Sequence, residues 1–359
     1  MPSRTDTPAR RFVFAAHDSG GANILKTLAG VAAGRGHRLA MFPSGPGREV
    51  YRGISVPGLV AFEGEDEAAL RACISDFDPH LIVTGTSVLS EFERTWWKIG
   101  AAGGVPSLAI VDAWGNFEGR FGQGASAPPQ PDAVAVIDDW CRDEMRRRSW
   151  CKARVHVVGQ PHLEAIGRRL HLARRHRAPQ GPLLILYASH PVTADWGGVK
   201  NVGFDEFTVA EALLAALAGP SAIRLVVKPH PREDAAGWTK WLKTISPPSN
   251  VAVELGGGSS EDWLLRADGV VSMFSTVLSE AASSGIPAMS LQPGRTSAIN
   301  AGLDHMLGVE FVTDLDMVRK QVAAFVNRLR SGERSATTNV PFEGSTARML
   351  AVLEAEAKR

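Results

Sequence analysis

The stretch from Ala267 to Leu291 constrains the fold more than any other part of the sequence. Its pattern predicts a short apolar strand over Gly269–Ser272, a turn rich in Ser and Thr, and a small-residue helix over about Ser275–Ser284. Gly285 ends this helix, and a second strand begins after Pro287. A strand, a helix and a strand joined by such short turns form one step of a doubly wound parallel sheet, so the sequence predicts an α/β fold.

The start of this helix has the chemistry of an anion site. Ser275 and Thr276 supply hydroxyl groups and unpaired backbone N–H groups at the carboxyl end of a strand. The helix dipole and these donors favour an anion such as phosphate. Glu280 follows one turn later, where it can accept hydrogen bonds from a ribose beside that phosphate. The alternative is that Ser and Thr only cap the helix, which is the commoner role at an isolated strand–helix junction.

A second stretch, Arg224–Arg232, is typical of a buried strand that ends in Lys-Pro-His-Pro-Arg. The two prolines restrict the backbone, so Lys228, His230 and Arg232 are expected to form a rigid cationic cluster. Open α/β sheets bind ligands at the carboxyl ends of their strands. Taken alone, these residues would be ordinary solvated turn residues, but together with the Ser-Thr helix they predict a site for an anionic ligand.

These two stretches resemble the donor half of two-domain (GT-B) nucleotide-sugar transferases. The shared pattern is a strand ending in Lys-Pro-His-Pro, followed by Ser-x-Phe-Ser-Thr-x-x-x-Glu-Ala-x-x-x-Gly-x-Pro. The sequence is most similar to the CDP-glycerol glycerophosphotransferase and capsule-polysaccharide glycosyltransferase group, and more distantly to bacterial sialyltransferases and UDP-N-acetylglucosamine 2-epimerases. The resemblance implies that His230, Ser275 and Thr276 hold the donor's phosphates and that Glu280 holds the ribose. It covers residues 182–292 well and the N-terminal half only loosely.

Length and composition fit two globular domains. A chain of 359 residues, 44% hydrophobic and 21% charged, can bury two cores. The net charge of +1 gives no reason to expect a nucleic-acid partner. Three cysteines without CxxC spacing indicate neither a zinc site nor a disulfide framework. No apolar stretch is typical of a signal peptide or a membrane span, so a cytoplasmic protein is expected.

The N-terminal half places polar residues at the ends of two predicted strands. The strand Phe12–Ala16 ends in His17 and Asp18. The glycine pair that follows, Gly20 and Gly21, allows a ligand to approach the backbone at the start of a helix expected from about residue 23. The alternative is a tight turn between strand and helix, for which His17 and Asp18 are not needed.

A second polar strand end is Asp112-Ala-Trp-Gly-Asn116, after the strand Ser107–Asp112. Trp114 and the Gly- and Pro-rich run Phe121–Pro131 predict an exposed loop on the acceptor side. Asp112 could equally be only a turn former, since carboxylates are common at strand ends.

Two segments lie near the end of this half. The basic run Arg142–Arg154 is most simply a solvated face, although it could meet acidic lipid headgroups, which would give a peripheral membrane contact, or a phosphorylated acceptor. Gly159 and Pro161 form a Gly-x-Pro turn similar to the one that closes the N-terminal domain of these transferases. A helix to about His176 follows.

The predicted domains are an acceptor-side domain over residues 1–176, a linker over 177–181 and a nucleotide-donor domain over 182–344. The donor domain opens with the strand Pro182–His190, whose polar end includes Ser189, and continues in a Gly-rich loop over Pro191–Gly203. The resemblance implies that the last helix, within residues 345–359 and capped by Ser345, packs back on the N-terminal domain.

The sequence thus predicts an α/β protein of two Rossmann-like domains with parallel sheets facing a central cleft. The expected activity is transfer of a group from a nucleotide-sugar or a CDP- or CMP-linked donor to a hydroxyl of a sugar, lipid-linked glycan or small molecule, as in surface-polysaccharide or glycoconjugate synthesis. No cofactor and no metal is expected, because no metal-binding motif is present. Asp18 is the first candidate for the general base, with His17 and Asp112 behind it. The expected donor-binding residues are Ser189, Lys228, His230, Arg232, Ser275, Thr276 and Glu280.

Two other functions remain open at this point. A non-hydrolysing sugar-nucleotide epimerase or a hydrolase would share the donor site and need no acceptor. A binding protein that has lost catalysis would keep the fold and the affinity for the nucleotide.

Overall fold

The computed structural model describes residues 8–52, 54, 59–61, 66–122, 130–174, 181–297, 304–306, 308–332 and 342–357. The chain divides into two compact units. Unit 1 comprises Met1–His162 and Phe342–Arg359, and unit 2 comprises Leu163–Pro341. The units meet in the sequence before the predicted linker at 177–181, of which only Gly181 is described.

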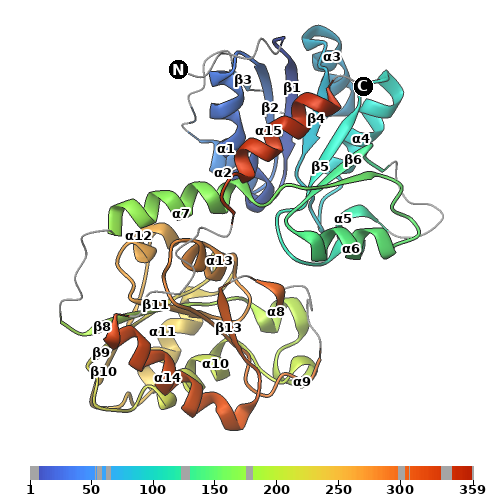
Figure 1. The fold of residues 1–359 in the computed structure, drawn as a ribbon. Coiled ribbons are helices and arrows are strands. Elements are labelled where there is room, and N and C mark those ends of the chain that lie inside the picture. Colours follow the sequence, from blue (N-terminus) through green and yellow to red (C-terminus); the bar gives the residue numbers. More distant parts are fainter. Residues whose placement is uncertain are drawn as a thin grey trace. The chain divides into compact units, whose positions relative to one another are not determined.

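Unit 1 is built on a seven-stranded parallel sheet with the order β3-β2-β1-β4-β5-β6-β7 (Figure 1). The strands are β1 (Arg11–Ala16), β2 (Arg38–Pro43), β3 (Leu59–Ala61), β4 (Leu81–Thr84), β5 (Ser107–Ile110), β6 (Ala133–Val136) and β7 (Arg154–Val157). The helices are α1 (Ser19–Gly34), α2 (Gly47–Tyr51), α3 (Glu67–Phe77), α4 (Phe92–Gly103), α5 (Phe117–Phe121), α6 (Asp139–Arg147), α7 (Pro161–Arg174), which continues into unit 2, and α15 (Ser345–Glu356).

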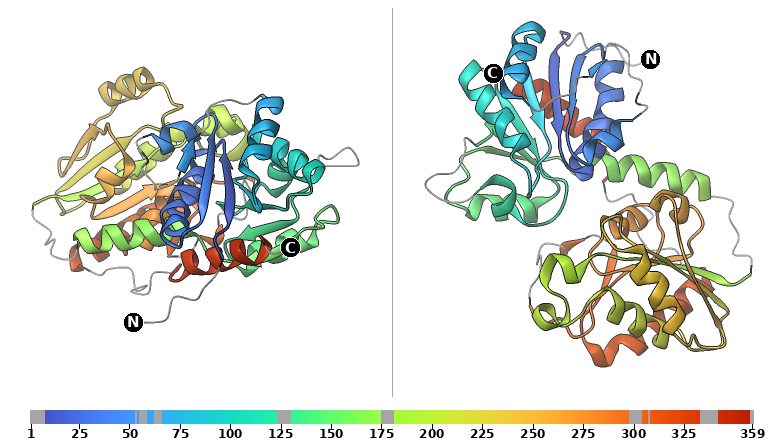
Figure 2. Two further views of the ribbon diagram at one scale, coloured as in Figure 1. Left: turned by 90° about the horizontal axis from the view of Figure 1, so that it is seen from above. Right: turned by 180° about the vertical axis from the view of Figure 1, so that it is seen from behind.

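Both faces of this sheet are covered, which explains why every residue of the strands β4, β5 and β6 is buried. Alternate residues of β1 point to opposite faces. Phe12 and Phe14 join the core cluster that includes α1 and α15, whereas Val13 joins the cluster that includes α3 and α4. Figures 1 and 2 show α15, from the end of the chain, lying beside α1.

Unit 2 repeats this architecture with a six-stranded parallel sheet in the order β10-β9-β8-β11-β12-β13. The strands are β8 (Leu183–Ala188), β9 (Ile223–Lys228), β10 (Val251–Leu255), β11 (Gly269–Ser272), β12 (Ala288–Leu291) and β13 (Val309–Val312). The helices are α8 (Val192–Trp196), α9 (Val199–Val202), α10 (Glu206–Ala216), α11 (Ala235–Thr244), α12 (Ser260–Leu264), α13 (Thr276–Ser283) and α14 (Val318–Ser331), the last preceded by a 3₁₀ turn over Leu315–Met317.

The predicted α/β class with two Rossmann-like units is confirmed, and the stretch that opened the sequence analysis folds as β11, α13 and β12. None of the described helices is both long and apolar enough to cross a membrane.

Several local predictions were wrong. Helix α1 begins at Ser19 rather than near Asn23, so Gly20 and Gly21 lie in its first turn. The predicted loop over Pro191–Gly203 contains α8 and α9. The edge strands β7 and β13 were not expected, because each carries a charged residue and neither is fully buried.

Gly159 allows the start of α15 to reach the end of β7. Its backbone has a φ of +85°, and a Cβ at this position would lie 2.0 Å from Ser345 Oγ. That hydroxyl accepts a hydrogen bond from the backbone N–H of Gln160 (3.1 Å) and donates to the carbonyl of Phe342. The hydroxyl of Ser345 therefore links the segment after β7 to the start of α15. Ser345 was expected to cap this helix, but the N-cap residue is Gly344.

We expect Gly159→Ala to destabilise unit 1 by about 2 kcal/mol, because the new methyl group would meet Ser345 in a backbone conformation that favours glycine. Gly30→Ala is the matched control, since a Cβ at Gly30 meets nothing within 4 Å and the residue lies inside α1. Urea unfolding should show a stability gain of up to about 1 kcal/mol for the control. Equal stabilities for the two variants would contradict this account of the turn.

Candidate functional site

The order in which the chain adds strands to the sheet of unit 2 reverses between β8 and β11. The chain runs outward from β8 through β9 to β10 and then returns to β11 on the other side of β8. In open α/β sheets ligands bind at the carboxyl ends of the strands at such a switch point. The fold gathers several sequence-predicted residues at one edge of unit 2. Ser189 follows β8, Lys228 is the last residue of β9 and His230 follows it, and Ser275 and Thr276 follow β11. We call this region the β8–β9–β11 edge.

Short hydrogen bonds fix the strand ends at this edge. The backbone N–H of Ser189 donates to the carbonyl of Lys228 (2.9 Å), which joins the ends of β8 and β9. The hydroxyl of Ser272 donates to the carbonyl of Ala188 (2.5 Å), which joins β11 to β8. On the far side, Gln292 Nε2 donates to the carbonyl of Met273 (3.0 Å). The edge is therefore a rigid platform for the residues after it.

Ser275 is the N-cap of α13, and its hydroxyl accepts the N–H of Val277 (3.3 Å). Thr276 is exposed in the first turn, and Glu280 lies half-buried one turn further on. The capping role weighed in the sequence analysis is thus real for Ser275. The side chain of Ser275 accepts from one of the first backbone N–H groups, and the helix dipole still favours an anion at this end.

Lys228 is the cation at this edge that no other side chain neutralises directly. Its side chain is half-buried, and burial lowers the pKa of its ammonium group, although the nearby Glu233 acts in the opposite direction. In the described part of the chain, no hydrogen bond or ion pair engages this ammonium group. A partly desolvated, unpaired lysine favours an anionic ligand.

His230 is placed as a neutral hydrogen-bond donor. The backbone N–H of Arg232 donates to its Nδ1 (3.1 Å), so Nδ1 is unprotonated and Nε2 carries the proton. Burial is the main reason why the pKa of His230 is lowered, and the charge of Arg232 adds to it. A neutral Nε2–H can donate to a phosphate oxygen.

Arg232 does not contribute an open positive charge. Its two Nη atoms each lie 2.7 Å from a carboxylate oxygen of Asp195, in a bidentate pair. The predicted cluster of Lys228, His230 and Arg232 is therefore less cationic than the sequence suggested, because one member is neutral and another is paired.

Sequence reasoning missed an aromatic group beside His230. His190, which follows β8, lies with its ring centroid 5.4 Å from that of His230, 5.2 Å from Trp196 and 5.0 Å from Phe274. Burial lowers the pKa of His190 to about 4, and the neighbouring His230 contributes, so the ring is neutral at pH 7. Its position at a strand end was the signal that could have identified it.

Unit 1 has its own switch point between β1 and β4, and its polar residues also gather there. Gly21 in the first turn of α1 packs on Gly85 after β4, since a Cβ on Gly21 would lie 2.9 Å from Gly85 Cα. We call the carboxyl ends of these strands and of their neighbour the β1–β4–β5 edge. It holds His17 and Asp18 after β1 and Asp112 after β5.

Asp18 and His17 form a pair at this edge. His17 Nδ1 lies 2.7 Å from Asp18 Oδ1. Asp18 precedes α1 in an extended conformation, but its side chain makes no capping hydrogen bond. With 44% of its side chain exposed, Asp18 is open to a ligand. The side chain of Asp18 therefore does not cap α1.

Asp112 is held in an ion pair. Arg120 Nη1 lies 2.5 Å from Asp112 Oδ1 and also donates to the carbonyl of Thr86 (2.8 Å). A Cβ on Gly20 would lie 1.8 Å from Asp112 Oδ2, so glycine is required where the carboxylate meets the first turn of α1. Only 12% of the Asp112 side chain is exposed.

Glu93 of α4 lies beneath this edge and was not predicted. Only 2% of it is exposed, and its Oε1 accepts the backbone N–H of His17 (2.9 Å) and the hydroxyl of Ser87 (2.8 Å). Burial raises the pKa of Glu93, and the charge of Asp18 raises it further. Nothing in the local sequence distinguishes it from other helical glutamates.

Trp114 was expected in an exposed loop on the acceptor side, and this prediction is wrong because the residue is buried. It is 3% exposed, its Nε1 donates to Asp138 Oδ2 (2.6 Å), and its ring packs on Phe342. Of the run Phe121–Pro131, residues 123–129 lie outside the described residues.

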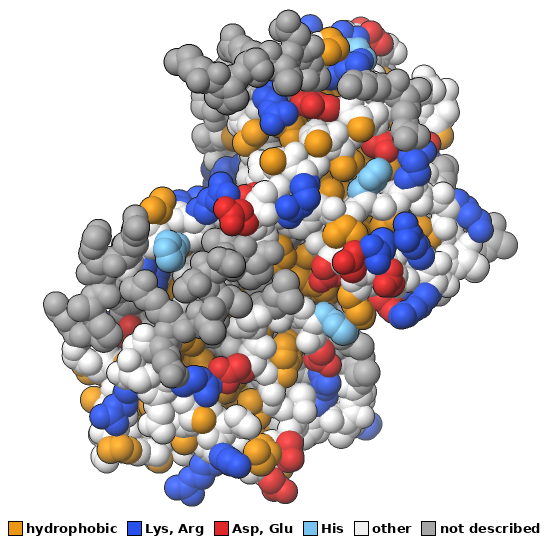
Figure 3. Space-filling view, in the orientation of Figure 1, with side chains coloured by type: hydrophobic (Ala, Val, Ile, Leu, Met, Phe, Trp, Pro, Cys, Tyr) orange, Lys and Arg blue, Asp and Glu red, His pale blue; other side chains and the backbone are white. Residues whose placement is uncertain are grey.

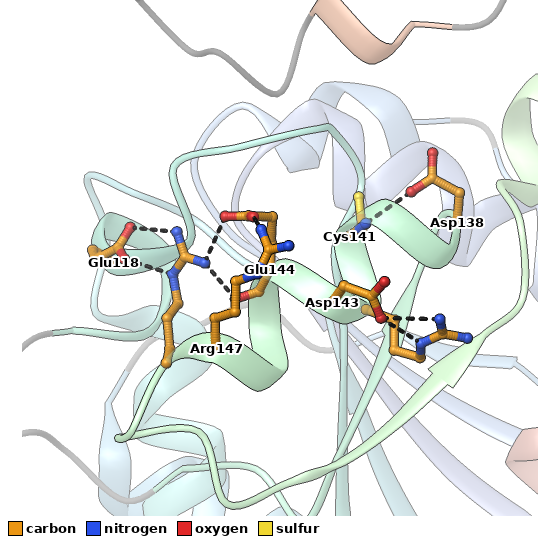
Figure 4. A network of polar contacts seen from close by, with 8 residues as sticks. Glu118, Asp138, Cys141, Asp143, Glu144 and Arg147 are labelled. Atoms are coloured by element: carbon orange, nitrogen blue, oxygen red, sulfur yellow. Dashed lines mark hydrogen bonds and ion pairs between the residues drawn. The ribbon is translucent and has the colours of Figure 1, made fainter.

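Four of the six basic residues in the run near α6 pair with acids, namely Arg142, Arg147, Arg148 and Arg154. Arg148 donates to Glu118 (2.5 Å) and Glu144 (3.1 Å), and Arg154 pairs with Glu356. Figure 4 shows the network of polar contacts that includes Glu118 and Glu144. Figure 3 shows positive and negative side chains interspersed on the face that it displays. These pairs fit the solvated-face interpretation of the run.

Residues that could hold a metal do not cluster in the described part of the chain, where no group of three or more His, Cys, Asp or Glu side chains has a suitable arrangement. Cys141 is buried and unpaired, and burial raises the pKa of its thiol.

Comparisons with known proteins identify the fold. No family model matches the sequence, and no curated protein matches it. Among solved structures, a putative UDP-N-acetylglucosamine 2-epimerase from Listeria monocytogenes superposes with a TM-score of 0.71 at 12% identity, covering 98% of this chain and 97% of that one. The UDP-GlcNAc 2-epimerase from Neisseria meningitidis, bound to UDP-GlcNAc, gives 0.67 at 12% identity, covering 96% and 99%. MurG from Acinetobacter baumannii gives 0.58 at 10% identity, covering 97% and 100%. The chain thus has the two-domain GT-B-like fold of these proteins.

We expect Glu93→Gln to change the pH dependence of stability. A buried acid whose folded pKa lies above its ordinary value of 4.5 contributes stability that is lost as pH rises through the folded pKa. Gln stays neutral and keeps an acceptor for His17 and Ser87, so the variant should gain stability over the natural protein as pH rises. Urea midpoints at mildly acidic and mildly alkaline pH measure this.

Glu91→Gln is the control, because the pKa of Glu91 is shifted in the opposite direction to that of Glu93. A hydrogen bond from Arg94 lowers the pKa of Glu91, so this variant should lose stability at neutral pH, and the loss should shrink as pH falls. Parallel pH profiles for both variants would show that Glu93 is ionised in the fold.

Proposed function

We propose that the protein is a transferase that uses a nucleotide-activated sugar or a related CDP- or CMP-linked donor, bound at the β8–β9–β11 edge. The observation that carries this is the grouping, at one switch point, of the unpaired Lys228 ammonium, the Nε2–H of His230 and the start of α13. These three groups, an ammonium, a ring N–H and a helix N-terminus, can each bind an anion, and the strand ends hold them in place.

In the proposed reaction, the role of this edge is to stabilise the leaving phosphate. When an acceptor oxygen attacks the transferred group, the bond to the nucleotide breaks and its electron pair leaves with the terminal phosphate. Lys228 and His230 stabilise the charge that develops on that phosphate, which lowers the barrier because the charge is larger in the transition state than in the bound donor. The acceptor's proton must pass to a base.

Asp18 is the base that we propose in unit 1. It is more exposed than Asp112, and Asp112 is already bound to Arg120. His17 hydrogen-bonds to Asp18 and could take up or pass on the proton. Glu93 is too deeply buried to reach an acceptor.

The identity of the donor's nucleobase is a more detailed part of the proposal. The Lys-Pro-His-Pro and Ser-Thr motifs resemble those of the CDP-glycerol glycerophosphotransferase and capsule-polysaccharide group, which favours CDP. The structural neighbours include an epimerase bound to UDP-GlcNAc and a protein from Anabaena in complex with UDP-glucose, which favours UDP. The acceptor would be a hydroxyl compound in surface-polysaccharide or glycoconjugate synthesis.

Epimerisation is the second candidate, because three of the neighbours are described as UDP-N-acetylglucosamine 2-epimerases, one of them as putative. It predicts conversion of UDP-GlcNAc in the absence of any acceptor, detectable by proton NMR. Transferase activity predicts that UDP-GlcNAc alone stays unchanged and that a compatible acceptor is needed. A protein that binds nucleotide and turns over neither way would be a binding protein.

We expect UDP or CDP to stabilise the protein and His230→Ala to remove about half of this effect or more. At a hundredfold excess over Kd the nucleotide should add about 2.7 kcal/mol of stability. Loss of the Nε2–H donor to a charged phosphate should weaken binding about 10-fold or more.

Calorimetric titration of both proteins measures the affinity, with His171→Ala on the exposed side of α7 as the control. If His171→Ala and His230→Ala bind nucleotide equally well, the β8–β9–β11 edge is not the donor site.

We expect Asp18→Asn to lower turnover about 100-fold or more without changing nucleotide affinity, because Asn cannot accept the acceptor's proton. Asp66→Asn is the control, since Asp66 caps α3 in the same unit and Asn caps equally well. Single-turnover rates with a productive donor and acceptor measure the effect. Unchanged turnover in Asp18→Asn would pass the role of base to His17 or Asp112.

A further inference from the structure

Glu233 lies at the centre of the β8–β9–β11 edge, three residues after His230. Its Oε1 accepts the hydroxyl of Ser189 (2.7 Å) and Trp238 Nε1 (3.2 Å), and its Oε2 accepts the backbone N–H of His230. These donors come from the end of β8, from α11 and from the loop after β9. One carboxylate therefore fastens three segments of unit 2 together.

The same residue closes the turn that presents His230. The backbone N–H of Glu233 donates to the carbonyl of His230 (2.9 Å), while its side chain accepts from the N–H of His230. The N–H of Arg232, inside this turn, donates to His230 Nδ1 and so directs Nε2–H outward from the turn's own hydrogen bonds. The tautomer and direction of the His230 donor depend on a turn that Glu233 ties at both ends.

Charge alone would make Glu233 a poor neighbour for an anion. Burial raises the pKa of Glu233, its three hydrogen bonds oppose that rise, and Lys228 lies close enough to interact with it electrostatically. Glu206, also nearby, adds a further negative charge. In its ionised form Glu233 repels a phosphate and offsets part of the attraction from Lys228.

We propose that Glu233 is the positioning residue of the anion site: without contacting the donor, it holds the turn of His230 in the geometry that binds phosphate, and Ser189 braces the Glu233 carboxylate by donating its hydroxyl proton to it. This role rests on the nucleotide site proposed above. Its benefit to binding is that the His230 donor is already ordered before the ligand arrives, and this benefit exceeds the repulsion that Glu233 causes.

Unit 1 contains a related arrangement, found independently. Glu93 accepts the backbone N–H of His17 (2.9 Å) and the hydroxyl of Ser87 (2.8 Å). In each unit, then, a carboxyl group accepts the main-chain N–H of a histidine and the hydroxyl of a serine that follow two strands of the sheet. Two separate switch points are fastened by the same pair of contacts.

Two substitutions separate positioning from charge, with UDP as the probe. Removing a negative charge beside a phosphate site would, by charge alone, tighten UDP binding. Glu233→Gln should instead weaken it about 10-fold, because an amide has one acceptor oxygen for three donors. Glu233→Asp keeps the charge but shortens the side chain, so it should weaken UDP binding as well.

The matched control is Glu254→Gln, which removes the same charge at the end of β10, where Glu254 pairs with Arg224 on the surface. Its UDP affinity should stay within about twofold of the natural protein, as for other exposed charges. Calorimetry reports stoichiometry along with Kd, so a fall in the fraction of folded protein is distinguished from a change in affinity.

Ser189→Ala and its combination with Glu233→Gln extend the test. If Glu233 acts partly through Ser189, the double variant should lose less affinity than the sum of the single losses. Equal or tighter UDP binding by folded Glu233→Gln or Glu233→Asp would overturn the positioning role while leaving the nucleotide site intact. Failure of the natural protein to bind UDP or CDP would instead remove the proposed function.

Discussion

The parallel pairing of β8 with both β9 and β11 is the constraint on which the rest of unit 2 depends. Each strand is mostly apolar because helices cover both faces of the sheet, so polar residues occur where the strands stop. Parallel strands stop at the same edge, and the reversal of strand order at β8 leaves space between the loops. Residues distant in sequence, such as Ser189, Lys228 and Ser275, thus come together without any direct preference for one another.

The two switch points are built alike but differ in charge. At the β8–β9–β11 edge the unpaired Lys228 and the neutral His230 offer donors to an anion. At the β1–β4–β5 edge, Asp112 meets the first turn of α1, and Asp18 and Glu93 lie near it. Carboxylates already lie at the positive N-terminal end of α1, so a phosphate would be repelled there. This edge is better suited to accept a proton or to bind hydroxyl groups. This difference is the reason why we propose the donor site in unit 2 and the base in unit 1.

Much of the fold could be predicted because strand and helix periods are local properties. The stretch that contains β11, α13 and β12 was predicted almost to the residue, since a Ser cap and a Gly stop mark the helix ends. The edge strands β7 and β13 were missed because only pairing with a neighbour makes them strands. Trp114 was expected to be exposed, but its contact with Phe342 joins residues far apart in the chain.

The site divides in the same way. His230 and Thr276 stand in recognisable motifs, so the sequence placed them at strand and helix ends. The pairing of Arg232 with Asp195, of Asp112 with Arg120, and the roles of Glu93 and Glu233 depend on three-dimensional contacts that no local pattern encodes. Charge state was therefore the least predictable property, because it depends on burial and on partners.

The central claim is that a nucleotide binds at the strand ends of unit 2, and hydrogen–deuterium exchange with and without UDP tests it most directly. The account predicts slower exchange in the segments after β8, β9 and β11, which contain Ser189, His230 and Thr276, with little change in the segment that contains His17 and Asp18. Protection confined to the β1–β4–β5 edge, or no protection anywhere at saturating UDP and CDP, would contradict it.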